Sequence, residues 1–334
     1  MTSLITRRGL LSATAALSAT SLLPRASRAA GEWRPTENVR IIVPASAGGS
    51  TDVMGRLLAA HLQTAWGQSA VVENRSGGGG TIGTAEVARS KGDGHTILVG
   101  NPGPNAIAYS IFRNLPYKPE QLIPISNMIR IPNIVCAHPS VPIKTIPELI
   151  AYIKANPDKL NYGSSGVGQS PHLTGAWWLQ LTGLKMQHVP FRGAGPALQA
   201  ALAGDIQILF DNLYPSLPQV LDGKLNALAV TTTERSAQAP NVPAMRETAP
   251  ELAKFDVSSW FGVFYPKGTP QAAVDSLNGE IKVLLARADI QKTIATMGAV
   301  SDYGTPAQFA TFIDAETAKF KTIIDKEGLK MDVN

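Results

Sequence analysis

Short apolar runs alternate with segments of helical periodicity along most of this chain, and no other feature restricts its fold as strongly. Between the runs, apolar side chains recur every three or four positions, as Met54, Leu58 and Leu62 do. Such alternation predicts an α/β fold made of βα units around a mainly parallel sheet. The expected strands cover residues 39–43, 70–73, 96–99, 134–137, 160–162, 187–189, 206–210, 225–230 and 259–264.

Three of these strands lead into helices through turns rich in glycine and serine, at residues 44–52 (PASAGGSTD), 73–80 (ENRSGGGG) and 162–171 (YGSSGVGQSP). We expect Ser50 or Thr51 to cap the first helix and Ser170 to cap the third. Unpaired N–H groups and the helix dipole attract anions to a helix start, and glycine lets a ligand approach the backbone. The sequence therefore predicts an anion site beyond the carboxyl ends of the strands.

The spacing of the motifs disfavours several kinds of enzyme site. Residues 78–83 (GGGTIG) match the dinucleotide-binding pattern, but residues 100–103 (GNPG) lack the acid expected about 20 positions later. Residues 163–167 (GSSGV) lack the second glycine of the serine-hydrolase motif. The histidines are scattered, without metal-ligand spacing and a nearby acid. We therefore expect no catalytic residue, no metal and no cofactor.

Two single residues have alternative interpretations. His172 stands in the first turn of the helix that follows residues 162–171, where a ligand contact and a capping or water-bridging role both fit. Cys136 is the single cysteine and belongs to an apolar run, so we expect a buried, unreactive thiol.

The first 29 residues have the composition of an export signal. Arg7 and Arg8 precede the apolar residues 10–23, a stretch shorter than the about 20 residues that span a bilayer. Ser27 and Ala29 supply small residues at the cleavage positions. We expect a cleaved signal at residues 1–29 and a soluble periplasmic protein. The pattern of residues 6–11 also resembles a twin-arginine signal, so twin-arginine and general secretory export both stay open.

The formal net charge of +5 comes mainly from this leader. Four of the 30 basic residues and none of the 25 acidic residues lie in it, which leaves 26 bases against 25 acids. The charge of the remaining chain is therefore no evidence for nucleic-acid binding, which requires a clustered basic face. We expect no nucleic-acid partner.

Taken in order, the turns resemble the ligand loops of the Bug/TctC family, the extracytoplasmic receptors of tripartite tricarboxylate transporters. Residues 44–52 resemble the family's first loop, 73–80 its second, 162–173 its third and 189–193 (VPFRG) its fourth. Further matches at residues 204–211, 228–231 and 234–236 extend the resemblance over roughly residues 35–330. Where the family usually has an aromatic residue after the first-loop proline, this chain has Ala45.

The resemblance implies a two-lobed periplasmic-binding-protein fold of type II, with two hinge crossings and a ligand cleft between the lobes. One lobe is expected at residues 30–132 together with 260–334, and the other at 133–259. The resemblance also implies a monomer that binds a small carboxylate and delivers it to membrane permease subunits. The alternatives are a periplasmic enzyme and a ligand-sensing subunit, each acting on a small carboxylate.

The candidate ligand-binding residues lie on or beside these loops. We expect mainly uncharged donors to hold the anion, with Arg192 as a secondary contact. Asp52 can instead favour the helix dipole, and Asp211 can hold a water molecule or an amino group. The candidates are Ala45, Ser46, Gly48, Gly49, Asp52, Gly80, Asn101, Ser164, Ser170, His172, Phe191, Arg192 and Asp211.

Overall fold

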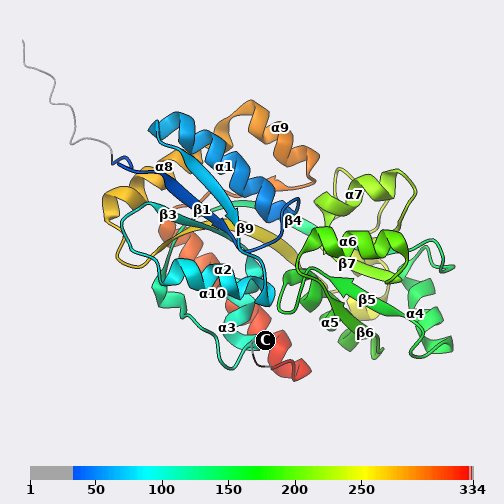
Figure 1. Ribbon diagram of the computed structural model, residues 1–334. Helices are drawn as coiled ribbons and strands as arrows, with labels where there is room; N and C mark the ends of the chain where they lie inside the picture. The colour runs from blue at the N-terminus through cyan, green and yellow to red at the C-terminus, as the bar shows by residue number, and fades with distance from the viewer. Residues whose placement is uncertain (1–32, 331, 333–334) are drawn as a thin grey trace, which may run out of the picture. The chain divides into compact units, whose positions relative to one another are not determined.

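The amino-terminal part of the fold is a group of parallel βα units, as the sequence predicts (Figure 1). The computed structural model describes residues 33–330 and 332, so the export signal predicted at residues 1–29 lies outside them. The strands pair in the order β2-β1-β3. The elements are β1 (Val39–Val43), α1 (Ser50–Trp66), β2 (Ala70–Asn74), η1 (Gly78–Gly80), α2 (Thr81–Ala88), β3 (Thr96–Gly100), η2 (Gly103–Ile107), α3 (Ala108–Ile111) and η3 (Pro119–Gln121).

A second group of parallel βα units forms the middle of the chain, where the strands pair in the order β7-β5-β6. In Figure 1, the helices α4 to α7 gather around these strands. The elements are α4 (Ile146–Ala155), β5 (Asn161–Ser164), α5 (Ser170–Thr182), β6 (Gln187–Pro190), α6 (Ala194–Ala203), β7 (Ile208–Asn212), α7 (Leu213–Leu221), β8 (Asn226–Val230), η4 (Met245–Glu247) and η5 (Pro250–Leu252).

Two long strands join the groups, and both run antiparallel to their neighbours. β4 (Leu122–Ala137) pairs with β9 (Ser258–Pro266) along residues 122–132, and from Asn133 onward it pairs with β7 and β8. The sheet is therefore mixed, and the prediction of a mainly parallel sheet is wrong for these strands. The first half of β4 was not predicted because Pro124 and Pro132 disfavour a strand interior.

The carboxyl-terminal helices return to the first group of strands, where α8 and α10 pack against β4 and α1 packs against α8. The longest helix, α10, begins with a capping box in which Thr305 and Gln308 exchange hydrogen bonds. The elements are α8 (Gln271–Ala286), α9 (Ala288–Thr296), β10 (Val300–Ser301) and α10 (Pro306–Glu327).

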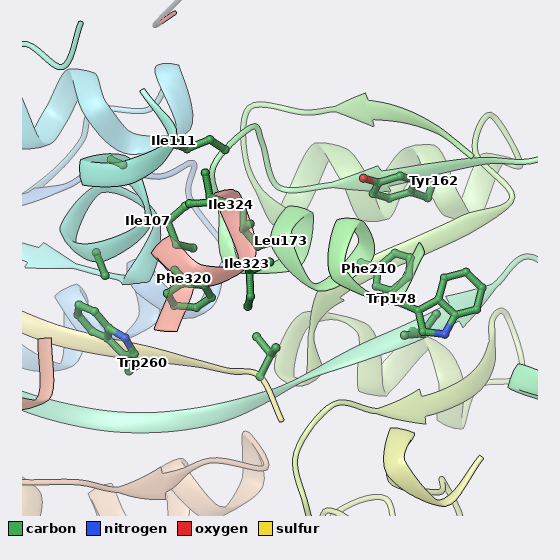
Figure 2. Packing of buried hydrophobic residues seen from close by; sticks show 14 of the residues in the cluster. Ile107, Ile111, Tyr162, Leu173, Trp178, Phe210, Trp260, Phe320, Ile323 and Ile324 are labelled. Atoms are coloured by element: carbon green, nitrogen blue, oxygen red, sulfur yellow. The ribbon is translucent and has the colours of Figure 1, made fainter. Parts of the chain in front are cut away.

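The hydrophobic core extends across both strand groups. Figure 2 shows Trp260 and Phe320 in one part of the cluster and Trp178 and Phe210 in another, with Leu173 between them. The described residues from Arg34 onward accordingly form one compact unit. Buried Cys136 belongs to this core, and burial raises the pKa of its thiol. No helix in the described part of the chain is long and apolar enough to cross a bilayer.

Candidate ligand-binding cleft

A cavity of about 280 Å³ lies where the carboxyl ends of the two groups of parallel strands meet. Parts of the four loops form its walls, and from here on the loop names cover only these parts: the first loop (residues 44–49), the second (75–80), the third (165–169) and the fourth (191–193). The first two belong to the amino-terminal strand group and the last two to the middle group. The lining comprises Pro44, Ala45, Ser46, Gly49, Ser50, Thr51, Gly77, Gly78, Gly79, Gly80, Asn101, Phe112, Ser165, Gly166, Val167, Gln169, Pro171, Pro190, Phe191, Arg192, Gly193, Ala194, Asn212, Ser259, Phe261 and Asp332.

The start of α1 brings unpaired polar groups to this cavity. Gly49 is the N-cap residue and no side chain caps the helix, so the prediction of a cap by Ser50 or Thr51 is wrong. Ser50 is only 2% exposed, and its buried hydroxyl, like that of Ser46, has no hydrogen-bond partner among the described residues. The first N–H groups of any helix also lack intrahelical partners. A buried hydroxyl without a partner costs about 1–3 kcal/mol, so this wall is suited to a polar ligand.

Asp52 holds the first loop in shape and is itself outside the cavity lining. Its Oδ2 accepts hydrogen bonds from the Gly48 N–H and from Arg56 Nε, each at 3.0 Å, and its Oδ1 accepts from Asn74 Nδ2 at 3.0 Å. Burial raises the pKa of Asp52, but these hydrogen bonds outweigh burial and bring its pKa below the usual value. The carboxylate is thus ionised, and its charge is paired with that of Arg56 on α1.

Ser164, on β5, anchors one end of the third loop from behind. The fully buried Ser164 hydroxyl lies 2.7 Å from His188 Nε2 and accepts from the Gly166 N–H at 3.2 Å. His172 Nδ1 accepts from the Gly168 N–H at 3.2 Å, near the other end of the loop. Ser164 and His172 therefore support the loop from outside the cavity lining.

The helix that follows this loop begins one residue earlier than predicted. Gln169 is the N-cap of α5, so the assignment of Ser170 as the cap is wrong. The Ser170 hydroxyl instead accepts a hydrogen bond of 2.8 Å from Asn133 Nδ2. Because this bond directs the Ser170 hydroxyl towards buried Asn133, Ser170 does not belong to the cavity lining.

The loops of the two strand groups touch across the cavity. Gln169 Nε2 donates to the Gly79 carbonyl at 2.8 Å, which joins the third loop to the second. A Cβ on Gly79 would overlap the carbonyl oxygen of Val167, and one on Gly193 would overlap the Ser46 side chain. The first loop therefore packs on the fourth and the second on the third, in contacts that only glycine permits.

The floor of the cavity is a buried amide and hydroxyl network centred on Asn133, where β4 passes between the groups. Asn133 Nδ2 donates to Ser170 and to Thr174, each at 2.8 Å. Its Oδ1 accepts from Asn212 Nδ2 at 2.7 Å and from Ser259 Oγ at 3.1 Å. Since Asn212 and Ser259 also line the cavity, the network connects the cavity to both crossing strands.

Asp211 is buried beside this floor and does not reach the cavity. Its Oδ2 accepts from Ser216 Oγ at 2.9 Å, while its Oδ1 has no partner among the described residues. Burial raises its pKa to about 7. Adjacent residues of a strand point to opposite faces, which explains why Asn212 reaches the lining and Asp211 does not.

The structure divides the candidate residues into two sets. The cavity is lined by Ala45, Ser46, Gly49, Gly80, Asn101, Phe191 and Arg192. Outside its lining lie Gly48, Asp52, Ser164, Ser170, His172 and Asp211. Sequence reasoning missed Ser50, Phe112, Gln169, Asn212, Ser259 and Phe261, which also line it.

Formal charge is scarce in the lining, where Arg192 and Asp332 are the ionisable residues among those described. The described residues also contain no group of three or more histidine, cysteine, aspartate or glutamate side chains suited to a metal ion. The cleft therefore offers hydroxyls, amides and helix starts, which are the groups that hold an anion without a counter-charge.

Comparison with known proteins agrees with this geometry. Residues 54–329 match the model of the tripartite tricarboxylate transporter family receptor, TctC. This chain belongs to the TctC family. Protein BugT of Bordetella pertussis is 34% identical over 99% of both chains.

Two solved structures extend the similarity of this TctC chain to ligand-bound proteins. The structure of R. palustris Rpa4515 with adipate has a TM-score of 0.85 and 32% identity, covering 88% of this chain and 98% of that one. MatC from Rhodopseudomonas palustris with bound malate has a TM-score of 0.82 and 30% identity, covering 87% and 99%. The predicted two-lobed α/β periplasmic-binding-protein fold and the family resemblance are thereby confirmed.

Proposed function

We propose that this protein captures a small organic carboxylate in its cleft and delivers it to a tripartite tricarboxylate transporter. The observation that carries this proposal is the buried, unpartnered hydroxyl of Ser50 at the start of α1. An anion at that point would accept from this hydroxyl and from the free N–H groups of the first helical turn. The Asn101 amide and the Ser46 hydroxyl line the same cavity.

The arrangement of α1 and α6 supports an anionic ligand. Gly49, the N-cap of α1, lies so close to the first residue of α6 that a Cβ on it would be 3.6 Å from Ala194 Cβ. Each helix start carries about half a positive charge, so the two starts repel each other. The acid beside them, Asp52, is already paired with Arg56. A bound anion would relieve this repulsion and would favour contact between the two sets of loops.

The ligand class follows from the relatives and from the composition of the cleft. Rpa4515 is bound to adipate and MatC to malate, both small dicarboxylic acids. In this chain Arg192 is exposed and can pair with a second carboxylate, while Phe112, Phe191 and Phe261 give the lining an apolar part. We propose Ala45, Ser46, Gly49, Ser50, Gly80, Asn101, Phe191 and Arg192 as the residues nearest the ligand.

The remaining parts of the proposal concern the whole receptor. We propose lobes of residues 30–132 with 260–334 and of residues 133–259, because β4 exchanges its partner β9 for β7 at Asn133. We propose a cleaved leader at residues 1–29, a monomeric periplasmic receptor and delivery to membrane permease subunits. We propose that the protein is not an enzyme, because the Ser164 hydroxyl, which lies 2.7 Å from His188 Nε2, is fully buried behind the third loop, where no substrate can reach it.

The test is mass spectrometry of the small molecules released when gently purified protein is denatured. The expected result is one organic carboxylate per chain, which is recovered unchanged after incubation with fresh protein. Release of no acid, together with no binding of adipate or malate, would refute carboxylate capture. Conversion of the acid into a product would favour the periplasmic enzyme instead.

A further inference from the structure

Two imidazole rings lie directly behind the third loop and form a stack with a tyrosine. The rings of His172 and His188 are 4.2 Å apart with an interplanar angle of 22°, and Tyr162 stacks on His188 at 4.8 Å and 24°. The rings come from α5, β6 and β5, so the stack fills the space between the sheet and the first turn of the helix. His172 is 5% exposed.

Each ring takes part in a hydrogen bond of the network that holds the loop. His172 Nδ1 accepts directly from the Gly168 N–H at 3.2 Å, so this nitrogen carries no proton. The Ser164 hydroxyl accepts from the Gly166 N–H, shares a hydrogen bond of 2.7 Å with His188 Nε2 and lies 3.4 Å from the Gly166 carbonyl oxygen. One amide of the third loop thus bonds directly to an imidazole nitrogen, and the other bonds to a hydroxyl that His188 positions.

The surroundings keep both rings neutral. Burial lowers the pKa of His172 to about 4; burial, and then the neighbouring His172, lower the pKa of His188 to about 3. The other ring facing the pair is Tyr162, and no acid or base among the described residues forms an ion pair with either histidine. Neutral rings stack without repulsion and leave their acceptor nitrogens free.

The loop that these rings hold contacts the opposite strand group across the cleft. Its Gln169 donates to the Gly79 carbonyl of the opposite strand group, and its Val167 carbonyl lies against Gly79. Gly166 and Gly168 have φ values of 132° and 75°, which only glycine adopts readily, so the backbone itself restrains the loop little. The side chains behind the loop must supply the restraint.

We propose that His172 and His188 are positioning residues, which hold the third loop in its ligand-binding conformation without touching the ligand. This inference rests on the proposed function for its effect on affinity, but the ordering of the loop can be measured without a ligand. His172 was a candidate ligand contact in the sequence, and His188 was not singled out there.

The test separates hydrogen bonding from stacking. His172→Phe and His188→Phe keep a stacked ring and lose the hydrogen-bonding nitrogen, whereas His172→Asn and His188→Gln keep a hydrogen-bonding amide group near Nδ1 and Nε2, respectively. The first readout is hydrogen–deuterium exchange of the Gly166 and Gly168 amides in ligand-free protein. The second is the affinity for adipate or malate, whichever the unaltered protein binds more tightly. His138→Phe, at a partly exposed ring bonded to Ser140, is the control.

We expect the phenylalanine variants to exchange these amides at least about tenfold faster and to bind the acid about tenfold more weakly, as the loss of one hydrogen bond predicts. The asparagine and glutamine variants should stay within about threefold of the unaltered protein, and the control should be unchanged. Unaltered exchange in both phenylalanine variants would overturn the proposal. So would equal effects in the phenylalanine and amide variants, because the retained hydrogen-bonding group would then make no difference. If no acid binds the unaltered protein, the proposed function fails while the exchange measurement still decides this inference.

Discussion

At the scale of single residues, the proposed binding mode depends on uncharged donors, while the acidic side chains Asp52 and Asp211 are committed elsewhere. The carboxylate of Asp52 holds the first loop, and the carboxyl group of Asp211 is buried out of reach. Ser50 contributes a hydroxyl that is buried and unpaired. Anion binding then depends on the direction of hydrogen bonds and dipoles more than on net charge.

Ser50→Ala is expected to weaken carboxylate binding about tenfold, since a hydrogen bond to a charged group contributes about 1.5–3 kcal/mol. The variant should lose no stability, because the hydroxyl has no partner within the described protein. Isothermal titration calorimetry and thermal melting measure the two effects. Ser90→Ala, at a hydroxyl bonded to the Glu86 carbonyl away from the cavity, is the matched control. Unchanged affinity in Ser50→Ala would contradict this role for the hydroxyl.

Asp211 is expected to make stability depend on pH. Its pKa is about 7 in the folded protein and about 3.9 in an unfolded chain. Between these values the folded protein holds a proton that the unfolded chain has lost, so stability falls as the pH rises from about 4 to 7. Asp211→Asn removes this penalty. We compare the melting temperature of Asp211→Asn with that of the unaltered protein at each pH. The difference in favour of the variant should be about 5 °C larger at pH 8 than at pH 4. An equal difference in melting temperature at both pH values would show that folding does not raise the pKa of Asp211.

At the scale of loops and strands, close backbone approach connects the two strand groups. Gly79 has φ +61°, and a Cβ on it would overlap the Val167 carbonyl across the cavity. Gly79→Ala should therefore weaken carboxylate binding about a hundredfold, equal to about 2.7 kcal/mol, because the loops cannot meet. Gly48→Ala is the control: its φ is +84° but its Cβ would have no neighbour within 4 Å. Equal losses of affinity in the two variants would show that backbone strain, and not the contact, is responsible.

The network around Asn133 is expected to stabilise the crossing of β4. Asn133→Leu removes a hydrogen-bond partner of three buried hydroxyl groups and of the partly buried Asn212 amide, and should cost about 3 kcal/mol of unfolding free energy. Denaturation by urea measures this loss. Asn226→Leu, at a side chain with a single hydrogen bond to the Ile143 carbonyl, should cost less than half as much. Similar losses in the two variants would argue against a cooperative network.

The strands and loops were largely predictable from local sequence, and their mutual contacts were not. Periodicity and glycine-rich turns locate β1, β5 and the loops after them, because these signals act over a few residues. The pairing of Ser164 with His188, and of Asn133 with Asn212, joins residues far apart in sequence. Local signals cannot distinguish a serine that faces a ligand from one that faces a histidine. For this reason the sequence suggested Ser164 and His172 as ligand contacts, although both lie behind the third loop.

At the scale of the whole molecule, two strand groups joined by β4 and β9 place the starts of α1 and α6 against each other, with a cavity between their loops. We propose that a small carboxylate satisfies these helix starts and the Ser50 hydroxyl. The negative charge of the ligand then has a decisive role in binding.

The most direct test compares an acid with its uncharged ester by isothermal titration calorimetry. We predict that adipate or malate binds with one site per chain, and that the corresponding dimethyl ester, which is uncharged and larger by two methyl groups, binds at least about a hundredfold more weakly. If the ester binds as tightly as the acid, the cleft does not recognise a carboxylate and the account is wrong.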